Sequence, residues 1–147
     1  MKPRVKRLAE IVAAPAYGRK KVCASLPEGR VEVTSARQLR HWLRRINSEC
    51  PRPLLAEVVR ADGDRLTVGL GRSRSFVTYI RADGNPPYLS VVSDRSDEEE
   101  IHFDCNGEPS YYSLRNTVPL GVALEVACQF AQSQGLPLPE VVDWEEV

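Results

Sequence analysis

The chain has 147 residues, of which 42% are apolar, the size of a single domain that buries one core without disulfide or metal staples. Its 20 basic and 20 acidic side chains cancel, which argues against disorder through excess charge and against global attraction to nucleic acid. The charges are nevertheless unevenly placed. Residues 1–50 hold twelve Lys and Arg against four Asp and Glu, whereas residues 51–147 hold eight against sixteen. Two halves of opposite sign are not expected to meet a partner in the same way.

The cysteines and the N-terminus bear on the compartment. The four cysteines are Cys23, Cys50, Cys105 and Cys128. Their separations fit neither zinc-site spacing nor a dense disulfide framework, so we expect buried free thiols in a reducing cytosol. Residues 2–7 are basic like the start of a secretory signal, but Glu10 follows and the next apolar stretch is too short. No run approaches the roughly eighteen apolar residues of a membrane span. We therefore predict a cytoplasmic protein without a membrane partner.

We predict a basic peripheral arm over residues 1–30 and a single domain over residues 31–147. The first helix is expected near the start of this domain. A strand is expected at residues 30–33. Ser35 and, three residues on, Gln38 have capping-box spacing, which predicts the start of a helix. Its apolar face consists of Leu39, Trp42, Leu43 and Ile46. Its arginines fall on other faces and are expected to be solvated, as is His41, because no nucleic-acid recognition motif accompanies them.

The middle of the chain predicts an antiparallel meander, because the apolar period changes to two. Strands are expected at residues 54–60, 65–70, 75–81, 88–93 and 100–105. Asp62 and Gly63 supply the tight turn of the first hairpin. The tetrapeptide Arg-Ala-Asp-Gly occurs at residues 60–63 and again at 81–84, which we interpret as repeated turn chemistry.

A second helix is predicted from Pro119, which suits a first helical position, to a stop at Gly135. Its helically spaced apolar residues are Leu120, Ala123, Leu124, Ala127 and Ala131, with Phe130 beside them. The chain then runs extended through Trp144. This order of elements predicts an α+β fold, in which an antiparallel meander of about five or six strands carries two main helices packed on one face.

The best candidates for chemistry are His102 and Asp104, which a strand projects on one face, opposite Ile101, Phe103 and Cys105. The two polar side chains could supply two metal ligands of a small hydrolase, with a third ligand arriving from elsewhere. The other interpretation is a polar strand face opposite a buried one. We favour the second, and so expect no catalytic residue, no metal and no cofactor.

The densest charge run suggests a different role. Asp97, Glu98, Glu99 and Glu100 are consecutive, and Asp94 precedes them. Such a run is either a solvated loop or a landing surface for a basic partner. Two tyrosines follow, Tyr111 and Tyr112, of which a strand turns at least one outward. An exposed tyrosine beside acidic residues suits a protein interface, although both are equally compatible with ordinary sheet positions.

The C-terminal third resembles the type-1 immunity protein family of bacterial polymorphic toxin systems. The residues that carry the resemblance are Ile101, His102, Phe103, Asn106, Gly107, Glu108, Thr117, Val118, Pro119, Ala123, Leu124, Phe130, Gly135, Leu136, Pro137, Val142, Asp143, Trp144 and Glu145. The helix with Trp42 and the Asp-Gly hairpin show a weaker similarity to the pattern of this family. The match spans roughly residues 34–146.

The resemblance implies a non-enzymatic antidote that binds a cognate toxin domain, such as a deaminase or nuclease acting on nucleic acids, and occludes its active site. The toxin is expected to be basic, and an acidic face suits a basic cleft. The expected partner-binding residues are Asp94, Asp97, Glu98, Glu99, Glu100, Glu108, Tyr111 and Tyr112. A secretion adaptor or chaperone that uses the same acidic face is the alternative from another class. Nucleic acid itself is not expected as a partner.

Overall fold

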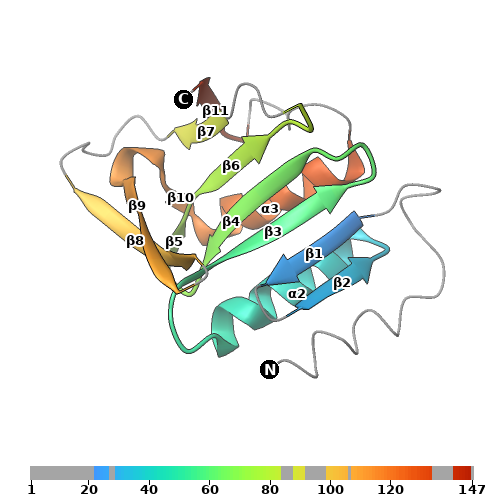
Figure 1. Cartoon of the computed structure of the whole chain (residues 1–147), viewed down its shortest axis with the longest axis horizontal. Coiled ribbons are helices and arrows are strands. Elements are labelled where there is room, and N and C mark those ends of the chain that lie inside the picture. Colours follow the sequence, from blue (N-terminus) through green and yellow to red (C-terminus); the bar gives the residue numbers. More distant parts are fainter. Residues whose placement is uncertain are drawn as a thin grey trace.

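In the computed structural model, the described residues are 22–26, 29–83, 88–91, 99–105, 107–133 and 141–146. The strands are β1 (Val22–Leu26), β2 (Gly29–Val33), β3 (Leu54–Arg60), β4 (Arg65–Leu70), β5 (Arg74–Ser75), β6 (Val77–Ile80), β7 (Tyr88–Val91), β8 (Glu100–Cys105), β9 (Glu108–Ser113), β10 (Val118–Pro119) and β11 (Asp143–Glu146). The helices are α2 (Ala36–Glu49), the short 3₁₀ helix η1 (Leu114–Asn116) and α3 (Leu120–Gln132). Figure 1 shows their arrangement around one large sheet.

The sheet has the strand order β11-β7-β6-β4-β3-β1-β2, and β8 joins β3 while pairing with β9. All these pairings are antiparallel except the contact between β3 and β8, which is parallel and joins Leu54 to Asp104. The predicted meander corresponds to β3, β4 and β6. β1 lies between β2 and β3, pairing with both. Residues 22–26 and 29–30, which the predicted boundary assigns to the peripheral arm, are therefore paired strand residues of the sheet. Residues 1–21 lie outside the described part.

Helix α2 begins as the sequence predicts. The Ser35 hydroxyl accepts a hydrogen bond from the Gln38 amide at 3.1 Å, which satisfies one of the unpaired N–H groups of the first turn. The Gln38 side chain reaches back to Thr34 rather than to Ser35, accepting from the amide at 3.0 Å and from the hydroxyl at 2.6 Å. The predicted apolar face is buried: it consists of Leu39, Trp42, Leu43 and Ile46.

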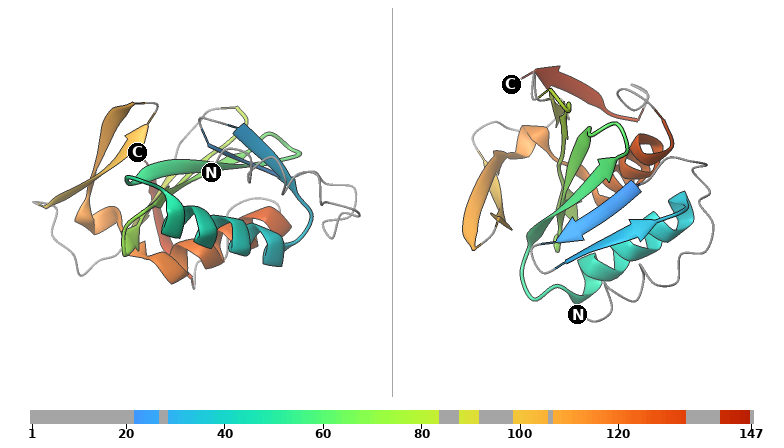
Figure 2. Two further views of the ribbon diagram at one scale, coloured as in Figure 1. Left: turned by 90° about the horizontal axis from the view of Figure 1, so that it is seen from below. Right: turned by 45° about the vertical axis from the view of Figure 1, so that its right-hand side comes forward.

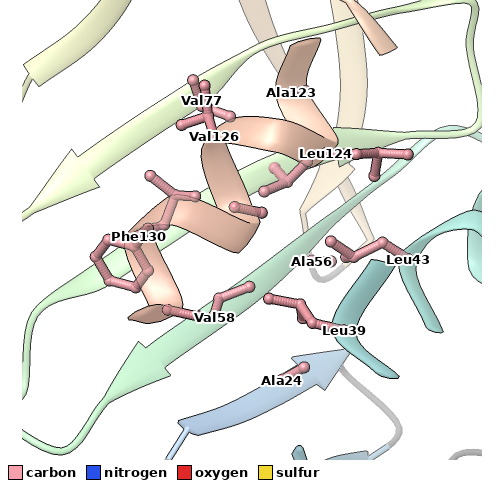
Figure 3. Packing of buried hydrophobic residues seen from close by; sticks show 14 of the residues in the cluster. Ala24, Leu39, Leu43, Ala56, Val58, Val77, Ala123, Leu124, Val126 and Phe130 are labelled. Carbon is pink, nitrogen blue, oxygen red and sulfur yellow. The ribbon is translucent and has the colours of Figure 1, made fainter. Parts of the chain in front are cut away.

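Both helices lie on the same face of the sheet (Figure 2). Helix α3 starts at Leu120, with Pro119 as the residue before it, and the predicted stop at Gly135 lies outside the described residues. The core forms between the layers, where Leu39 and Leu43 of α2 and Leu124 and Phe130 of α3 point towards β3 (Figure 3). Each fully buried side chain of this kind contributes about 1.5–3 kcal/mol. The predicted α+β class, with a mainly antiparallel sheet and two helices on one face, is confirmed.

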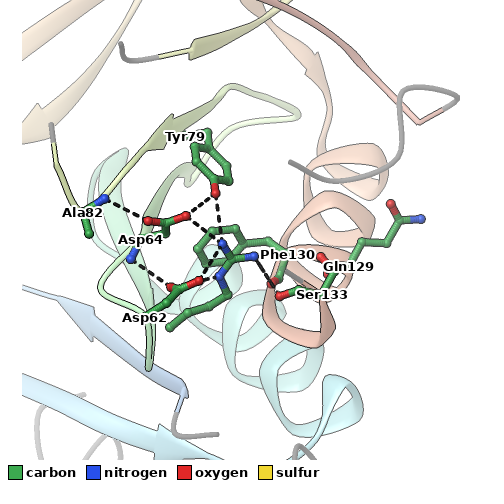
Figure 4. Close-up of polar contacts among 8 residues, drawn as sticks. Asp62, Asp64, Tyr79, Ala82, Gln129, Phe130 and Ser133 are labelled. Carbon is green, nitrogen blue, oxygen red and sulfur yellow. Dashed lines mark hydrogen bonds and ion pairs between the residues drawn. The ribbon is translucent and has the colours of Figure 1, made fainter. Parts of the chain in front are cut away.

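A buried arginine joins the end of α3 to the sheet (Figure 4). Arg60 at the end of β3 donates to the carbonyl oxygens of Phe130 at 3.2 Å and Ser133 at 2.8 Å. It also pairs with Asp64 at 2.8 Å and donates to the Tyr79 hydroxyl at 2.9 Å. Its guanidinium carbon lies 4.3 Å from the centre of the Phe130 ring. Arg60 therefore adds a donor for carbonyls at the C-terminal end of the helix, where ordinary intrahelical amide donors run out; the Phe130 carbonyl also accepts from the Ser133 amide at 3.4 Å.

The cysteines only partly match their prediction. All four are free, but only Cys128 is buried, and Cys105 is exposed. Cys105 is the last residue of β8 and pairs with Glu108 of β9 beside the turn of the hairpin. Separately, neither helix in the described residues is long and apolar enough to span a membrane.

Candidate binding surface

The β8–β9 hairpin projects from the sheet on the side away from both helices (Figure 2). Its two strands pair antiparallel from Glu100 opposite Ser113 to Cys105 opposite Glu108. Gly107 closes the turn with a φ of 92°, a left-handed conformation that glycine adopts without strain. Since directly opposite residues of an antiparallel pair share a face, the hairpin has an inner face towards the sheet and an outer face towards solvent.

Aromatic packing fixes the inner face to the sheet. Phe103 is fully buried, and its ring centre lies 5.4 Å from that of Phe76. The ring of Tyr112 stacks on Phe76 with centres 3.7 Å apart, and burial raises the pKa of its phenol. Phe103 also lies against Gly69, where a β-carbon would come within 2.7 Å of the ring. The missing side chain at Gly69 is what lets the hairpin approach β4 so closely.

Replacing Gly69 by alanine is expected to destabilise the protein by about 1–3 kcal/mol, because the added methyl group overlaps the buried Phe103 ring. Urea unfolding followed by circular dichroism measures the change. Gly121→Ala is the matched control, since a β-carbon there meets nothing within 4 Å and alanine favours the helix. Equal midpoints for Gly69→Ala and the wild type would contradict the assigned contact.

Hydrogen bonds hold both ends of the hairpin. At the β8 end, the Asp104 amide donates to the Pro53 carbonyl at 2.8 Å, and Arg72 donates to the His102 carbonyl at 3.1 Å. At the other end, Arg115 pairs with both carboxylate oxygens of Glu145 at 2.8 Å. The hydrogen bond from the Asn116 side chain, together with Arg115, lowers the pKa of Glu145 below its ordinary value. The hairpin is thereby presented as a supported surface rather than a free loop.

The outer face presents Glu100, His102 and Tyr111 to solvent. Tyr111 is 60% exposed and is the one large hydrophobic side chain exposed to this degree in the part of the chain that the structure describes. It lies directly opposite His102 in the hairpin, with ring centres 5.6 Å apart. An exposed aromatic on a rigid support is typical of the anchors that dominate protein interfaces.

The predicted partner-binding residues are thus only partly brought together. Glu99, Glu100, Glu108 and Tyr111 are exposed on the hairpin or at its start. Glu108 belongs to the inner face but lies at the open turn. Tyr112 is half-buried, and its ring stacks on Phe76 at the inner face of the hairpin. Asp94, Asp97 and Glu98 lie outside the described residues.

The described parts of the two charged regions, helix α2 and the β8–β9 hairpin, do not touch (Figure 2). Helix α2 and the hairpin lie on opposite sides of the sheet (Figure 2). Two of the helix arginines are paired within the helical layer, Arg40 with Glu125 at 2.5 Å and Arg45 with Glu49 at 3.1 Å. His41 is exposed, as expected. The acidic hairpin is therefore not neutralised by the basic helix.

The alternative metal site at His102 and Asp104 gains no further ligand. Asp104 lies 3.7 Å from Arg52 and accepts from the Gly107 amide at 3.3 Å. Within the described ranges, no three His, Cys, Asp or Glu side chains gather in a way that could hold a metal ion. Of the three residues expected to be buried behind them, Phe103 is buried, Ile101 is half-buried and Cys105 is exposed.

Sequence reasoning missed the residues that support the hairpin. Gly69 lies inside a predicted strand, and a glycine at such a position is a signal of close approach by another element. Phe76 carries no such signal, because its packing against Phe103 and Tyr112 joins segments distant in sequence.

A protein-family model described as Immunity protein Imm1 matches residues 28–146 of the chain. No curated protein matches the chain. The matched segment includes β2 to β11, both helices and the whole hairpin.

Proposed function

The chain belongs to the Imm1 family of immunity proteins, and we propose that it binds a cognate toxin domain through the outer face of the β8–β9 hairpin and blocks the toxin's active site. In this role the protein is an inhibitor and needs no catalytic group or cofactor of its own. The observation that carries the proposal is the exposed Tyr111 ring on a hairpin held from below by Phe103 and Tyr112.

A rigid aromatic suits this role because it buries a large area on binding while losing little conformational entropy. His102 beside it extends the contact surface, and its neighbour on the same face, Glu100, adds negative charge. The acidic segment with Asp94, Asp97, Glu98 and Glu99 leads directly into this strand. A basic cleft of the kind that binds nucleic-acid phosphates is the complementary surface. The proposed toxin therefore acts on nucleic acids, as a deaminase or nuclease does.

Tyr111→Ala is expected to weaken toxin binding by about 2 kcal/mol, or roughly thirtyfold in Kd, mainly through faster dissociation. The toxin domain encoded next to this chain's gene is the ligand for surface plasmon resonance. Tyr111→Phe is the conservative control and retains most of the affinity, because the ring remains. His41 is exposed on helix α2, on the opposite side of the sheet, so His41→Ala serves as the control outside the proposed interface. An unchanged Kd for Tyr111→Ala would remove the ring from the interface.

Replacing Asp97, Glu98, Glu99 and Glu100 together by alanine is expected to slow association and flatten its dependence on salt, because long-range attraction mainly sets the encounter rate. Stopped-flow association at low and high ionic strength measures both quantities. The matched control, Arg37→Ala with Arg44→Ala, removes two exposed charges from α2 and should leave the rate unchanged or raise it. A folded acidic variant with the wild-type rate and salt slope would show that this segment does not steer the toxin.

A further inference from the structure

The edge strand β2 offers backbone hydrogen-bonding groups to a further strand. Among the described residues β2 pairs only with β1, whose other side pairs with β3 (Figure 1). An unpaired edge is a template for another strand, and natural proteins commonly block it with charged side chains. β2 carries two exposed charges, Arg30 and Glu32. Whether they block the edge or select a partner depends on what a second strand places opposite them.

The hydrogen bonds of the neighbouring strands show which residues of β2 face the free edge. The Arg60 amide donates to the Asp64 carbonyl at 3.0 Å, so even-numbered residues of β3 bond to β4 and odd-numbered residues to β1. Because the bonding direction alternates along every strand, the register carries this pattern through β1 to β2. The amides and carbonyls of Arg30 and Glu32 therefore point to the free edge.

The side chains of the same two residues lie on the sheet face away from the helices, since Val31 and Val33 between and beside them are buried on the helix side. Glu32 takes part in no ion pair among the residues that the structure describes. The Arg30 guanidinium donates to the Cys23 sulfur at 3.1 Å, which is a weak acceptor. Both charges are therefore available to a partner strand.

Two copies of β2 match each other in one symmetric register. With a two-fold axis at Val31, both outward residues find partners within the strand, and Arg30 lies opposite Glu32 of the second copy on each side of the axis. An axis at Arg30 or at Glu32 places like charges directly opposite, which is destabilising. An axis further along needs the Thr34 amide, which already donates to the Gln38 side chain at 3.0 Å.

We propose that the chain forms a homodimer in which two β2 strands pair antiparallel about a two-fold axis at Val31. Arg30 of each copy exchanges two backbone hydrogen bonds with Glu32 of the other, and their side chains form an ion pair. The axis is perpendicular to the sheet, so both copies keep their helices on one face and their β8–β9 hairpins on the other. The dimer does not rest on the proposed function, and it presents two hairpins on the same side.

Sedimentation equilibrium of the full chain tests the assembly. A single strand pair is a small interface, so we expect a weak dimer that dissociates on dilution. At about 200 µM the mass should approach twice that of one chain, and it should fall towards one chain at about 2 µM. A monomer at the higher concentration would overturn the proposal. Slow deuterium exchange of the Arg30 and Glu32 amides in that monomer would show that another segment of the same chain covers the edge.

Charge reversal tests the register. Arg30→Glu places two carboxylates opposite each other and Glu32→Arg places two guanidinium groups opposite each other, so each variant should raise the dimer Kd at least about tenfold. The double variant with both changes restores unlike pairs and should dimerise like the wild type. An equimolar mixture of the two single variants should form a heterodimer, because each pair again joins opposite charges.

Matched controls reverse exposed charges elsewhere. Asp143→Arg lies on β11 at the opposite edge of the sheet and Arg37→Glu lies on α2, so neither should change the dimer Kd. Unfolding midpoints show whether each variant is folded, and recovery in the double variant separates lost charge pairing from lost folding. A wild-type Kd in both single variants, or a double variant that stays monomeric, would contradict pairing about Val31.

Discussion

Replacing Arg60 by alanine is expected to lower the free energy of unfolding by about 3–5 kcal/mol, because removing one partner of a buried ion pair leaves the other charge uncompensated. The Arg60 side chain is only 4% exposed, and that of Asp64 is 15% exposed. The same change removes one donor from the Phe130 carbonyl, the Arg60 hydrogen bond from the Ser133 carbonyl, and the cation beside the Phe130 ring. The loss therefore falls on the link between α3 and the sheet, and not on a single surface contact.

Urea unfolding followed by circular dichroism measures this loss. Arg60→Lys keeps the charge without the planar fork, so we expect an intermediate loss. Arg37→Ala, on the exposed side of α2, is the matched control and should stay within about 0.5 kcal/mol of the wild type. A loss below about 1 kcal/mol for Arg60→Ala would place it among ordinary surface pairs and contradict this account.

Stability is expected to fall by about 2 kcal/mol between pH 10 and pH 12 through the titration of Tyr79 alone. Burial of this side chain, which is 2% exposed, and its hydrogen bond to Asp64 raise the pKa from 10.0 to about 12, although Arg60 acts in the opposite direction. The folded state therefore keeps the phenol protonated where the unfolded chain has lost the proton. This contribution is complete below pH 10 and disappears as the pH passes through the folded pKa.

The difference between wild type and Tyr79→Phe isolates this effect from other groups that titrate at alkaline pH. Phenylalanine cannot ionise, so the variant should lose less stability over this interval, although the missing hydroxyl costs about 1 kcal/mol at neutral pH. Tyr111→Phe, at an exposed position, should follow the wild-type curve. Parallel curves for wild type and Tyr79→Phe from pH 9 to 12 would show that Tyr79 titrates alike in both states.

The Arg60 network and the hairpin lie at opposite ends of β3. The strand starts at Leu54, which pairs with β8, and ends at Arg60, so about 20 Å separates the two sites. The proposed binding residues are thus separate from the Arg60 network. For variants in the hairpin's outer face whose unfolding midpoints match the wild type, a change in affinity can be attributed to binding and not to lost stability.

Local patterns in the sequence predicted the elements well. The Ser35 cap, the apolar face of α2 and the alternation of β3 and β4 depend on neighbours within a few residues, so their signals are complete in the sequence itself. The outward turn of one tyrosine followed from strand alternation too. Strand alternation does not determine whether Tyr111 or Tyr112 points outward, however, because it leaves open which face of the hairpin packs on the sheet. That was decided by Phe103 fitting against Gly69.

The repeated tetrapeptide Arg-Ala-Asp-Gly shows where local reasoning stops. Its first arginine, Arg60, is 5% exposed and holds the end of α3, whereas the second, Arg81, is exposed. Arg60 is the last residue of β3 and Arg81 directly follows β6, and alternate residues are buried in both strands. The sequence by itself determined the α+β class, the family resemblance and a chain of uneven charge. Only the tertiary structure decided that helix α2 and the β8–β9 hairpin lie on opposite sides of the sheet (Figure 2) and which arginine is buried, because burial depends on the helix that packs over each strand end.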